Sequence, residues 1–306
     1  MDTSHDVGLT TTQSTYIEKA QSKGQLYIQQ PYELYSEGNQ RTWQRLYANL
    51  LPKWQKYANA KFLTGVENLM LKPDSIPKLS EINQFLSPLS GFEAKAVSGY
   101  VPAYLFFECL RNRSFPTTIT IRGGESLDYL PEPDIFHDIA GHVPMHTDRK
   151  FSDVLVRFGE VAQLAALRAR AMTQSESEGI AMVENNIKAM ARFFWFTIEF
   201  GLMKQGNDLK VYGSGLLSSS GEIKNAIESP HVQRYDLQLE WVVNQHFEID
   251  RYQPLLFVVD SFDHLFQLVD DLQKHLQDGK LDNVAPGEPL VNEKDLGSFL
   301  NAEIEP

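Results

Sequence analysis

Apolar residues in the first third of the chain recur at helical spacing. Trp43 and Leu50 share one helical face, and the same pattern resumes at Tyr57, beyond Pro52. Because proline interrupts a helix interior, we predict two helices divided at Pro52. The segment SIPKLSEINQFL predicts a further helix that starts at its proline, with the N-cap at or near Ser75.

Two long helices are predicted in the middle of the chain, over 151–172 and 180–202, because the polar stretch TQSESEG separates two periodic runs. A final helix contains His264 and Leu272. Strand character is confined to TTITIR at 117–122, where β-branched residues alternate, and to PLLFVVDSF from Pro254. The predicted fold is mainly α with a few short β-strands.

Composition and charge narrow the class of protein. The 306 residues are 42% hydrophobic, which is enough for one sizeable core, and no internal repeat or linker divides them. A formal net charge of −12 argues against nucleic acid as a partner. Cys109 is the single cysteine, which excludes internal disulfides and multi-thiolate metal sites. Neither a secretory signal nor a membrane span is recognisable, so we expect a cytoplasmic protein without a membrane partner.

The two ends of the chain differ in character from its middle. A polar, Thr/Ser-rich opening predicts a flexible N-terminal arm at 1–24, and a similar composition predicts an extended C-terminal tail at 283–306. We expect residues 25–282 to form a single domain.

The segment PEPDIFHDIAGH at 131–142 carries the first candidate chemistry, with His137 and His142 five residues apart. Side chains at this spacing point about 140° apart on a regular α-helix, and paired histidines are more often structural than ligands. We predict that Gly141 takes a left-handed conformation and ends the helix, so that His142 folds back toward His137. Zinc proteases space their histidines four apart with Glu beside the first, whereas Asp138 stands here, so a zincin is disfavoured.

A second candidate is Glu199, which lies among aromatic residues in ARFFWFTIEFGL. A buried carboxylate is expected to be protonated, ion-paired or bound to metal, unless it sits at an exposed helix edge. Two histidines and one carboxylate make the facial triad of non-heme Fe(II) oxygenases.

Four blocks of sequence carry a family resemblance: IRGGESLDYLPEPDIFHDIAGHVP, FWFTIEFGL, KQGNDLKVYGSGLLSSSGE and YQPLLFVVDSF. With these blocks, in this order, the chain resembles the pterin-dependent aromatic amino acid hydroxylases over about residues 30–262. The resemblance is strongest to the compact bacterial phenylalanine hydroxylases.

The resemblance implies a role for each matching residue. It implies iron ligation by His137, His142 and Glu199. It implies pterin binding by Gly99, Tyr100, Val101, Phe106, Asp138, Ala191 and Phe194. It implies that Arg122 binds the carboxylate of the amino acid, and that the rest of the substrate pocket includes Leu130, Pro133, Trp195, Gly215, Ser218, Ser219 and Val258. Without the resemblance, Arg122 is a surface charge, Trp195 a core residue and GSGLLSS a turn.

Three features depart from the family pattern. Asp138 stands where Glu is expected near the pterin, and Phe194 stands where the animal enzymes often carry tyrosine. The segment between His142 and Glu199 is longer than expected.

The implied activity is an Fe(II)- and tetrahydropterin-dependent monooxygenase that uses dioxygen to hydroxylate an aromatic amino acid. Trp195 and Val258 favour phenylalanine to tyrosine; the alternatives are tryptophan 5-hydroxylation or another ring position. Two other classes stay open: a zinc-dependent hydrolase using the same ligands, and a non-catalytic relative that only binds the amino acid. The tail does not repeat in heptads, so we expect a monomer, and we expect no regulatory domain.

Overall fold

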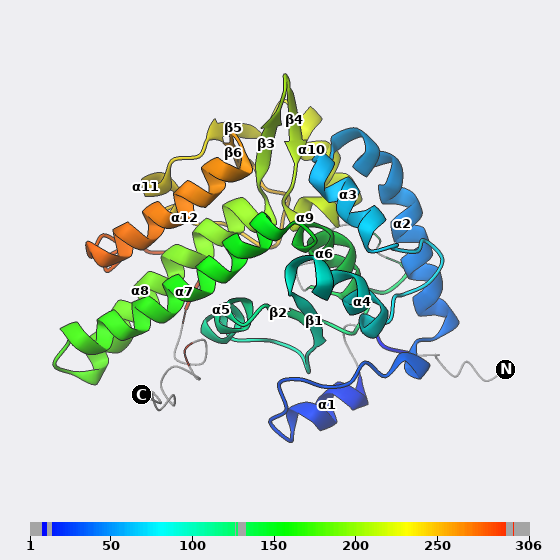
Figure 1. Ribbon diagram of the computed structural model, residues 1–306, viewed down its shortest axis with the longest axis horizontal. Helices are drawn as coiled ribbons and strands as arrows, with labels where there is room; N and C mark the ends of the chain where they lie inside the picture. Colours follow the sequence, from blue (N-terminus) through cyan, green and yellow to red (C-terminus); the bar gives the residue numbers. More distant parts are fainter. Residues whose placement is uncertain (1–7, 11–13, 126, 128–132, 292–295, 297–306) are drawn as a thin grey trace.

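The computed structural model describes residues 8–10, 14–125, 127, 133–291 and 296. Helices dominate and strands are few and short, which confirms the predicted fold class (Figure 1). The α-helices are α1 Thr15–Gln21, α2 Glu37–Tyr57, α3 Ala60–Asn68, α4 Leu79–Ser90, α5 Ala103–Arg111, α6 Val143–His146, α7 Arg149–Met172, α8 Glu176–Phe194, α9 Ser214–Leu217, α10 Ser220–Glu228, α11 Leu239–Val242 and α12 Phe262–Gln277. A 3-10 helix, η1, spans Tyr32–Leu34, and two π-helices span Phe136–His142 (η2) and Trp195–Glu199 (η3).

The strands form two small sheets. One sheet pairs β1 Glu93–Ala96 in parallel with β2 Ser114–Thr117. The other has the order β4-β3-β6-β5, with β3 Leu202–Gln205, β4 Asp208–Val211, β5 Gln233–Asp236 and β6 Leu255–Val259. In this sheet β3 and β4 are antiparallel, while β6 runs parallel to both β3 and β5.

The break predicted at Pro52 is wrong, because α2 runs through it to Tyr57. Pro52 and Ala48 both lie on the exposed face of the helix, so the carbonyl that loses its hydrogen bond faces water. The buried face continues without interruption to Trp54. Two helices do form, but Ala58 and Asn59 separate them.

Two further predictions in this half of the chain are wrong. The helix α4 begins at Leu79 with Lys78 at its N-cap, and not at Ser75. The strand predicted at 117–122 lies almost wholly outside β2, which ends at Thr117. Side-chain carboxylates explain the second difference, because Asp138 accepts the Thr118 N–H and Asp134 accepts the Arg122 N–H that a strand ladder would use.

The central helices match their predictions except at two boundaries. The first long helix is confirmed as α7, but α8 begins inside the polar break, at Glu176, where Ser175 accepts the Glu178 N–H. Its regular part ends at Phe194, the π-helix η3 follows, and β3 starts at Leu202. The late strand and the final helix are confirmed as β6 and α12.

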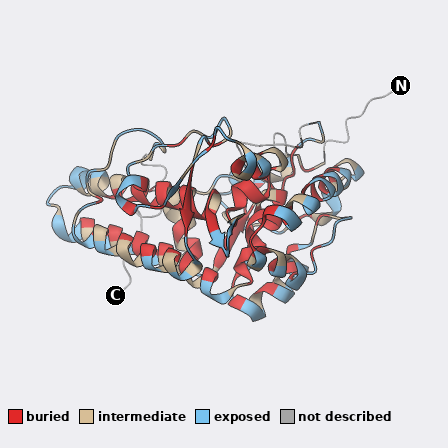
Figure 2. Ribbon diagram, turned by 90° about the horizontal axis from the view of Figure 1, so that it is seen from above, coloured by how far each residue is buried: buried red, intermediate tan, exposed pale blue. Residues whose placement is uncertain are grey.

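The long helices α7 and α8 lie side by side along one half of the molecule, and α12 packs on α7 (Figure 1). In the other half α3 packs on α6, which in turn packs on η2, and buried segments concentrate where the halves meet (Figure 2). The short helix α9 packs against both η2 and η3 at this meeting point. Within the described part of the chain, no helix is both long and apolar enough to cross a bilayer.

Candidate active site

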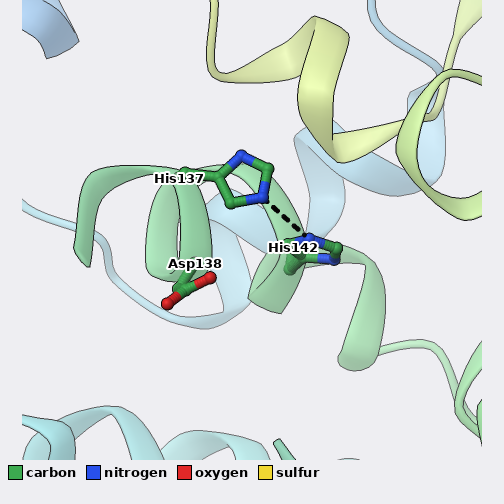
Figure 3. Close-up of side chains that lie close together, drawn as sticks. All are labelled: His137, Asp138 and His142. Carbon is green, nitrogen blue, oxygen red and sulfur yellow. Dashed lines mark hydrogen bonds between the residues drawn. The ribbon is translucent and has the colours of Figure 1, made fainter. Parts of the chain in front are cut away.

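His137 and His142 face each other on η2, with their Nε2 atoms 3.1 Å apart (Figure 3). The reason is the π-helical winding, in which the Val143 N–H bonds to the Asp138 carbonyl five residues earlier. Residues five apart therefore lie on one face, which a regular α-helix forbids. The helix continues directly into α6, so the predicted helix end at Gly141 is wrong, although the two histidines do meet.

Gly141 serves a different purpose from the one predicted. Its backbone is not left-handed, but a Cβ atom there would lie 3.0 Å from the Ser214 carbonyl oxygen and 3.2 Å from the Ser218 Cβ. Glycine at this position lets η2 approach α9 closely.

Glu199 reaches the same point from η3, where the Phe200 N–H bonds to the Trp195 carbonyl in a second π-turn. Its Oε1 lies 3.0 Å from His142 Nε2, and its Oε2 lies 3.6 Å from His137 Nε2. The structure thus brings together the three residues that the sequence suggested as iron ligands.

The charge states in this cluster suit a metal. Burial lowers the pKa of His137 to about 4, although the nearby Glu199 charge works against that shift. Burial by itself raises the pKa of Glu199, but the charges and hydrogen bonds of His142, the charge of His137 and the Ser214 hydroxyl lower it to about 2. At neutral pH His137 is neutral and Glu199 is ionised, as ligation requires.

Ser218 contacts the imidazole of His137. Its Oγ lies 2.8 Å from His137 Nδ1 and 3.3 Å from the Gly215 carbonyl oxygen. When its hydroxyl proton points at Gly215, Ser218 accepts from Nδ1–H. The lone pair of His137 is then on Nε2, which points toward His142 and Glu199.

Asp138 belongs to the same group of possible metal ligands, since one ligand atom from each of His137, Asp138 and His142 lies within 4.8 Å of the others. Its carboxylate nevertheless points away from the two imidazoles (Figure 3). Its Oδ2 accepts the Thr118 N–H at 2.6 Å, and burial raises its pKa to about 7. A carboxyl that is partly protonated at neutral pH is a poorer ligand than Glu199.

Donor spacing also fits a single metal ion. Bonds of about 2.1 Å at right angles place neighbouring donors about 3.0 Å apart. The two Nε2 atoms are 3.1 Å apart, Glu199 Oε1 is 3.0 Å from His142 Nε2, and Glu199 Oε2 is 3.6 Å from His137 Nε2. Two imidazoles and one carboxylate on one side of an ion leave its other positions open.

Arg122 is 3% exposed and pairs with the fully buried Asp134. Its Nε donates to Asp134 Oδ2 at 2.8 Å and its Nη2 donates to Oδ1 at 3.0 Å, so the guanidinium plane is fixed. Asp134 Oδ1 also accepts the His137 N–H at 2.9 Å. The arginine expected to bind substrate is therefore tied to the backbone of a metal-ligand candidate.

Residues expected to bind the pterin partly converge. The ring of Phe106 meets that of Phe194 edge to face at 5.5 Å, and it lies 6.2 Å from Phe115, which packs on His142. Of the others, Tyr100 is 78% exposed, while Gly99, Val101 and Ala191 are half-buried or nearly so.

The residues expected to line the substrate pocket are only partly brought together. The Trp195 ring stacks on Phe247 at 4.0 Å and lies 4.5 Å from Phe200, which Gly215 approaches closely. Among the other members of the predicted set, Ser219 caps α10, Val258 sits in β6 between β3 and β5, and β6 contacts η3. Pro133 is exposed, and Leu130 is outside the described residues.

Sequence reasoning missed three residues of the site: Ser214, Asp134 and Phe247. Ser214 lies between the two glycines of GSG, a signal of close packing that could have marked it. Asp134 precedes the histidine motif, but its pairing with Arg122 depends on the fold. Phe247 has no local signal at all.

A metal-type triad beside a buried Arg–Asp pair, on a mainly helical domain, invites comparison with known proteins. A family model described as biopterin-dependent aromatic amino acid hydroxylase matches residues 15–280. The chain belongs to this family. Membership decides against the zinc-hydrolase alternative.

Curated relatives of this hydroxylase family member are named phenylalanine-4-hydroxylase. That of Chromobacterium violaceum is 32% identical over 283 residues, covering 90% of each chain. That of Caulobacter vibrioides is 37% identical over 238 residues, covering 78% of this chain and 76% of the relative. The Bos taurus protein is 35% identical but matches only 48% of its own length.

Solved structures agree with the sequence comparison. The Chromobacterium violaceum phenylalanine hydroxylase with bound iron(III) and the oxidised cofactor 7,8-dihydrobiopterin aligns with a TM-score of 0.74 at 30% identity, covering 90% of this chain and 96% of that one. The same enzyme bound to cobalt aligns with a TM-score of 0.73 at 32% identity, covering 86% and 88%.

Proposed function

We propose that this family member hydroxylates L-phenylalanine to L-tyrosine, using Fe(II), a tetrahydropterin and dioxygen. The observation that carries the proposal is the convergence of His137, His142 and Glu199 within 3.6 Å, in a chain whose relatives are named phenylalanine-4-hydroxylase. When bound, the iron and the pterin together supply the electrons and the reactive centre that activate dioxygen.

The residues of the chain hold and orient the reactants. Arg122 binds the substrate carboxylate, and its ion pair with Asp134 keeps the guanidinium in one plane. The aromatic wall of Trp195, Phe200 and Phe247 receives the substrate ring and excludes water from it.

On the pterin side, the contacting rings of Phe106 and Phe194 line the cofactor site together with Gly99, Tyr100, Val101 and Ala191. Asp138 contacts the pterin with a carboxyl whose raised pKa allows it to donate a hydrogen bond at neutral pH. Leu130, Pro133, Gly215, Ser218, Ser219 and Val258 complete the proposed substrate pocket.

A turnover assay tests this function. Anaerobically iron-loaded protein is given a tetrahydropterin, oxygen and, in separate reactions, phenylalanine, tyrosine or tryptophan, and the products are identified by mass and retention. Tyrosine from phenylalanine, with one oxygen atom from ¹⁸O₂, is expected. A hydroxylated tryptophan formed faster than tyrosine would favour the alternative substrate, and no product from any of the three would overturn the proposal.

We also propose that the protein acts as a cytoplasmic monomer, with an arm at 1–24, a catalytic domain at 25–282 and a tail at 283–306. The buried thiol of Cys109 suits a reducing compartment. Light scattering coupled to size-exclusion chromatography should give a mass near 34.8 kDa.

A further inference from the structure

Ser214 occupies a position that the proposed function leaves unused. It is 2% exposed and begins α9, the helix that packs against both π-helices. Two glycines that allow close backbone contacts, Gly213 and Gly141, fix the position of Ser214. A Cβ at Gly213 would lie 2.5 Å from the Glu199 carbonyl oxygen, and one at Gly141 would lie 3.0 Å from the Ser214 carbonyl oxygen.

The Ser214 hydroxyl touches two of the three ligand candidates. Its Oγ lies 2.9 Å from Glu199 Oε2, 2.9 Å from His142 Nε2 and 3.2 Å from the Ile198 carbonyl oxygen. The Ser214 hydroxyl carries one proton, so it can donate fully to only one of these three possible acceptors at a time. Once the lone pair of His142 binds a metal, the carboxylate is the stronger of the two remaining acceptors, because hydrogen bonds to charged groups are the stronger ones.

We propose that Ser214 is a positioning residue that donates to Glu199 Oε2 and so orients the carboxylate toward the metal. Oε1 is the oxygen that lies 3.0 Å from His142 Nε2. Ser214 thus supports Glu199 as Ser218 supports His137, and both serines come from the GSGLLSS segment. This inference rests on the metal site of the proposed function.

The test measures metal binding independently of turnover. Metal-free wild type, Ser214→Ala and Ser214→Thr are titrated with Co(II), and with Fe(II) under nitrogen. The visible spectrum of bound Co(II) reports its coordination number. Loss of an outer-shell partner typically costs 10–100-fold in metal affinity. We expect Ser214→Ala to raise the dissociation constant about 10-fold or more and to change the Co(II) spectrum, and Ser214→Thr, which keeps the hydroxyl, to stay near wild type.

Ser152→Ala is the matched control, because Ser152 is fully buried and its hydroxyl donates only to the His146 carbonyl. It should lose stability without a change in either metal readout. An unchanged affinity and spectrum in Ser214→Ala, or an equal change in Ser152→Ala, would overturn the proposal for Ser214. Glu199→Gln separates this from a failure of the proposed function: if it binds metal as the wild type does, the metal site itself is wrong.

Discussion

Single atoms decide whether this site can hold a metal. The Nε2 atoms of two histidines and the carboxylate of Glu199 come within 3.6 Å of one another, and side chains behind them set their orientation and charge. Ser218 contacts His137 Nδ1, and the paired hydrogen bonds to Asp134 fix the plane of Arg122. Substitutions at these residues should therefore change binding more than folding.

Replacing Glu199 with Gln should weaken Fe(II) binding by more than the 10–100-fold typical of outer-shell changes, because a neutral amide of equal volume replaces an ionised ligand. Iron content after desalting and product formation should fall together. Glu228→Gln, an exposed change, is the control. Wild-type iron content in Glu199→Gln would remove this residue from the triad.

Replacing Arg122 with Lys should raise the KM for the amino acid with a smaller effect on kcat. Lysine offers a point charge in place of a fork, and the lost charge-assisted hydrogen bond corresponds to about 1.5–3 kcal/mol. Steady-state kinetics at saturating pterin measure the effect. Arg157→Lys, on the outer part of α7, should leave the KM unchanged. If both variants behave alike, another group binds the carboxylate.

At the scale of elements, two π-turns and one short helix build the site. η2 precedes α6 and η3 follows α8, and each carries its ligand candidates where it packs against α9. The close approach of η2 to α9 requires a residue without a side chain at 141.

Gly141→Val should therefore separate η2 from α9 and lower metal affinity, while most of the helical circular dichroism remains. Gly141→Ala should show a smaller effect in the same direction, because its Cβ meets neighbours at 3.0 and 3.2 Å but adds no branches. Metal titration and circular dichroism on the same preparations measure both. Full metal affinity in the valine variant would show that the approach is not needed.

The segment 8–10 is a second element that contacts the site, although it lies outside the family match at 15–280. Leu9 is 1% exposed, its N–H donates to Asn39, and its carbonyl accepts the Ile121 N–H beside Arg122. Leu9→Asp should destabilise this contact and raise the KM for the amino acid. Leu34→Asp, an exposed leucine, is the control. Equal kinetics in the two variants would show that the segment does not support Arg122.

At the scale of the whole molecule, the buried ionisable groups decide how the free energy of unfolding changes with pH. His146 is fully buried among Phe92, Phe115 and Phe151, and neither ring nitrogen has a hydrogen-bond partner within the described residues. Burial lowers its pKa well below 6.5, as it lowers that of His137 to about 4. Asp138 behaves oppositely, because burial raises its pKa from 3.8 to about 7.

These shifts set the sign of the pH dependence in metal-free protein. Between pH 6 and 5, His137 and His146 bind more protons in the unfolded chain than in the folded protein, so acidification lowers the stability. Asp138 binds more protons in the folded protein, so its contribution to stability rises on acidification. Two histidines against one carboxyl leave the unfolded chain with about one more bound proton than the folded protein. The free energy of unfolding therefore falls by about 1.4 kcal/mol for each pH unit of acidification. Glu199, with its pKa near 2, contributes only below pH 4.5.

Urea unfolding of metal-free protein at pH 6 and pH 5 measures this slope. His146→Leu removes one of the two histidines and should bring the slope close to zero, while raising stability at pH 5. An unchanged slope in that variant would mean that His146 is protonated in the folded protein or bound to a group not considered above.

The sequence by itself determined the fold class, the family and the ligand candidates, because helical periodicity and short motifs depend on neighbouring residues. It also located α7, β6 and α12 closely. It misplaced the strand at 117–122 and the helix end at Gly141, because both depend on partners distant in sequence. Carboxylates from 134 and 138 take the backbone donors of the expected strand, and η2 winds as a π-helix against α9. Only the tertiary structure decided how His137 and His142 meet, which residue fixes Arg122, and that Ser214 lies between two ligand candidates, since each depends on packing that no local pattern encodes.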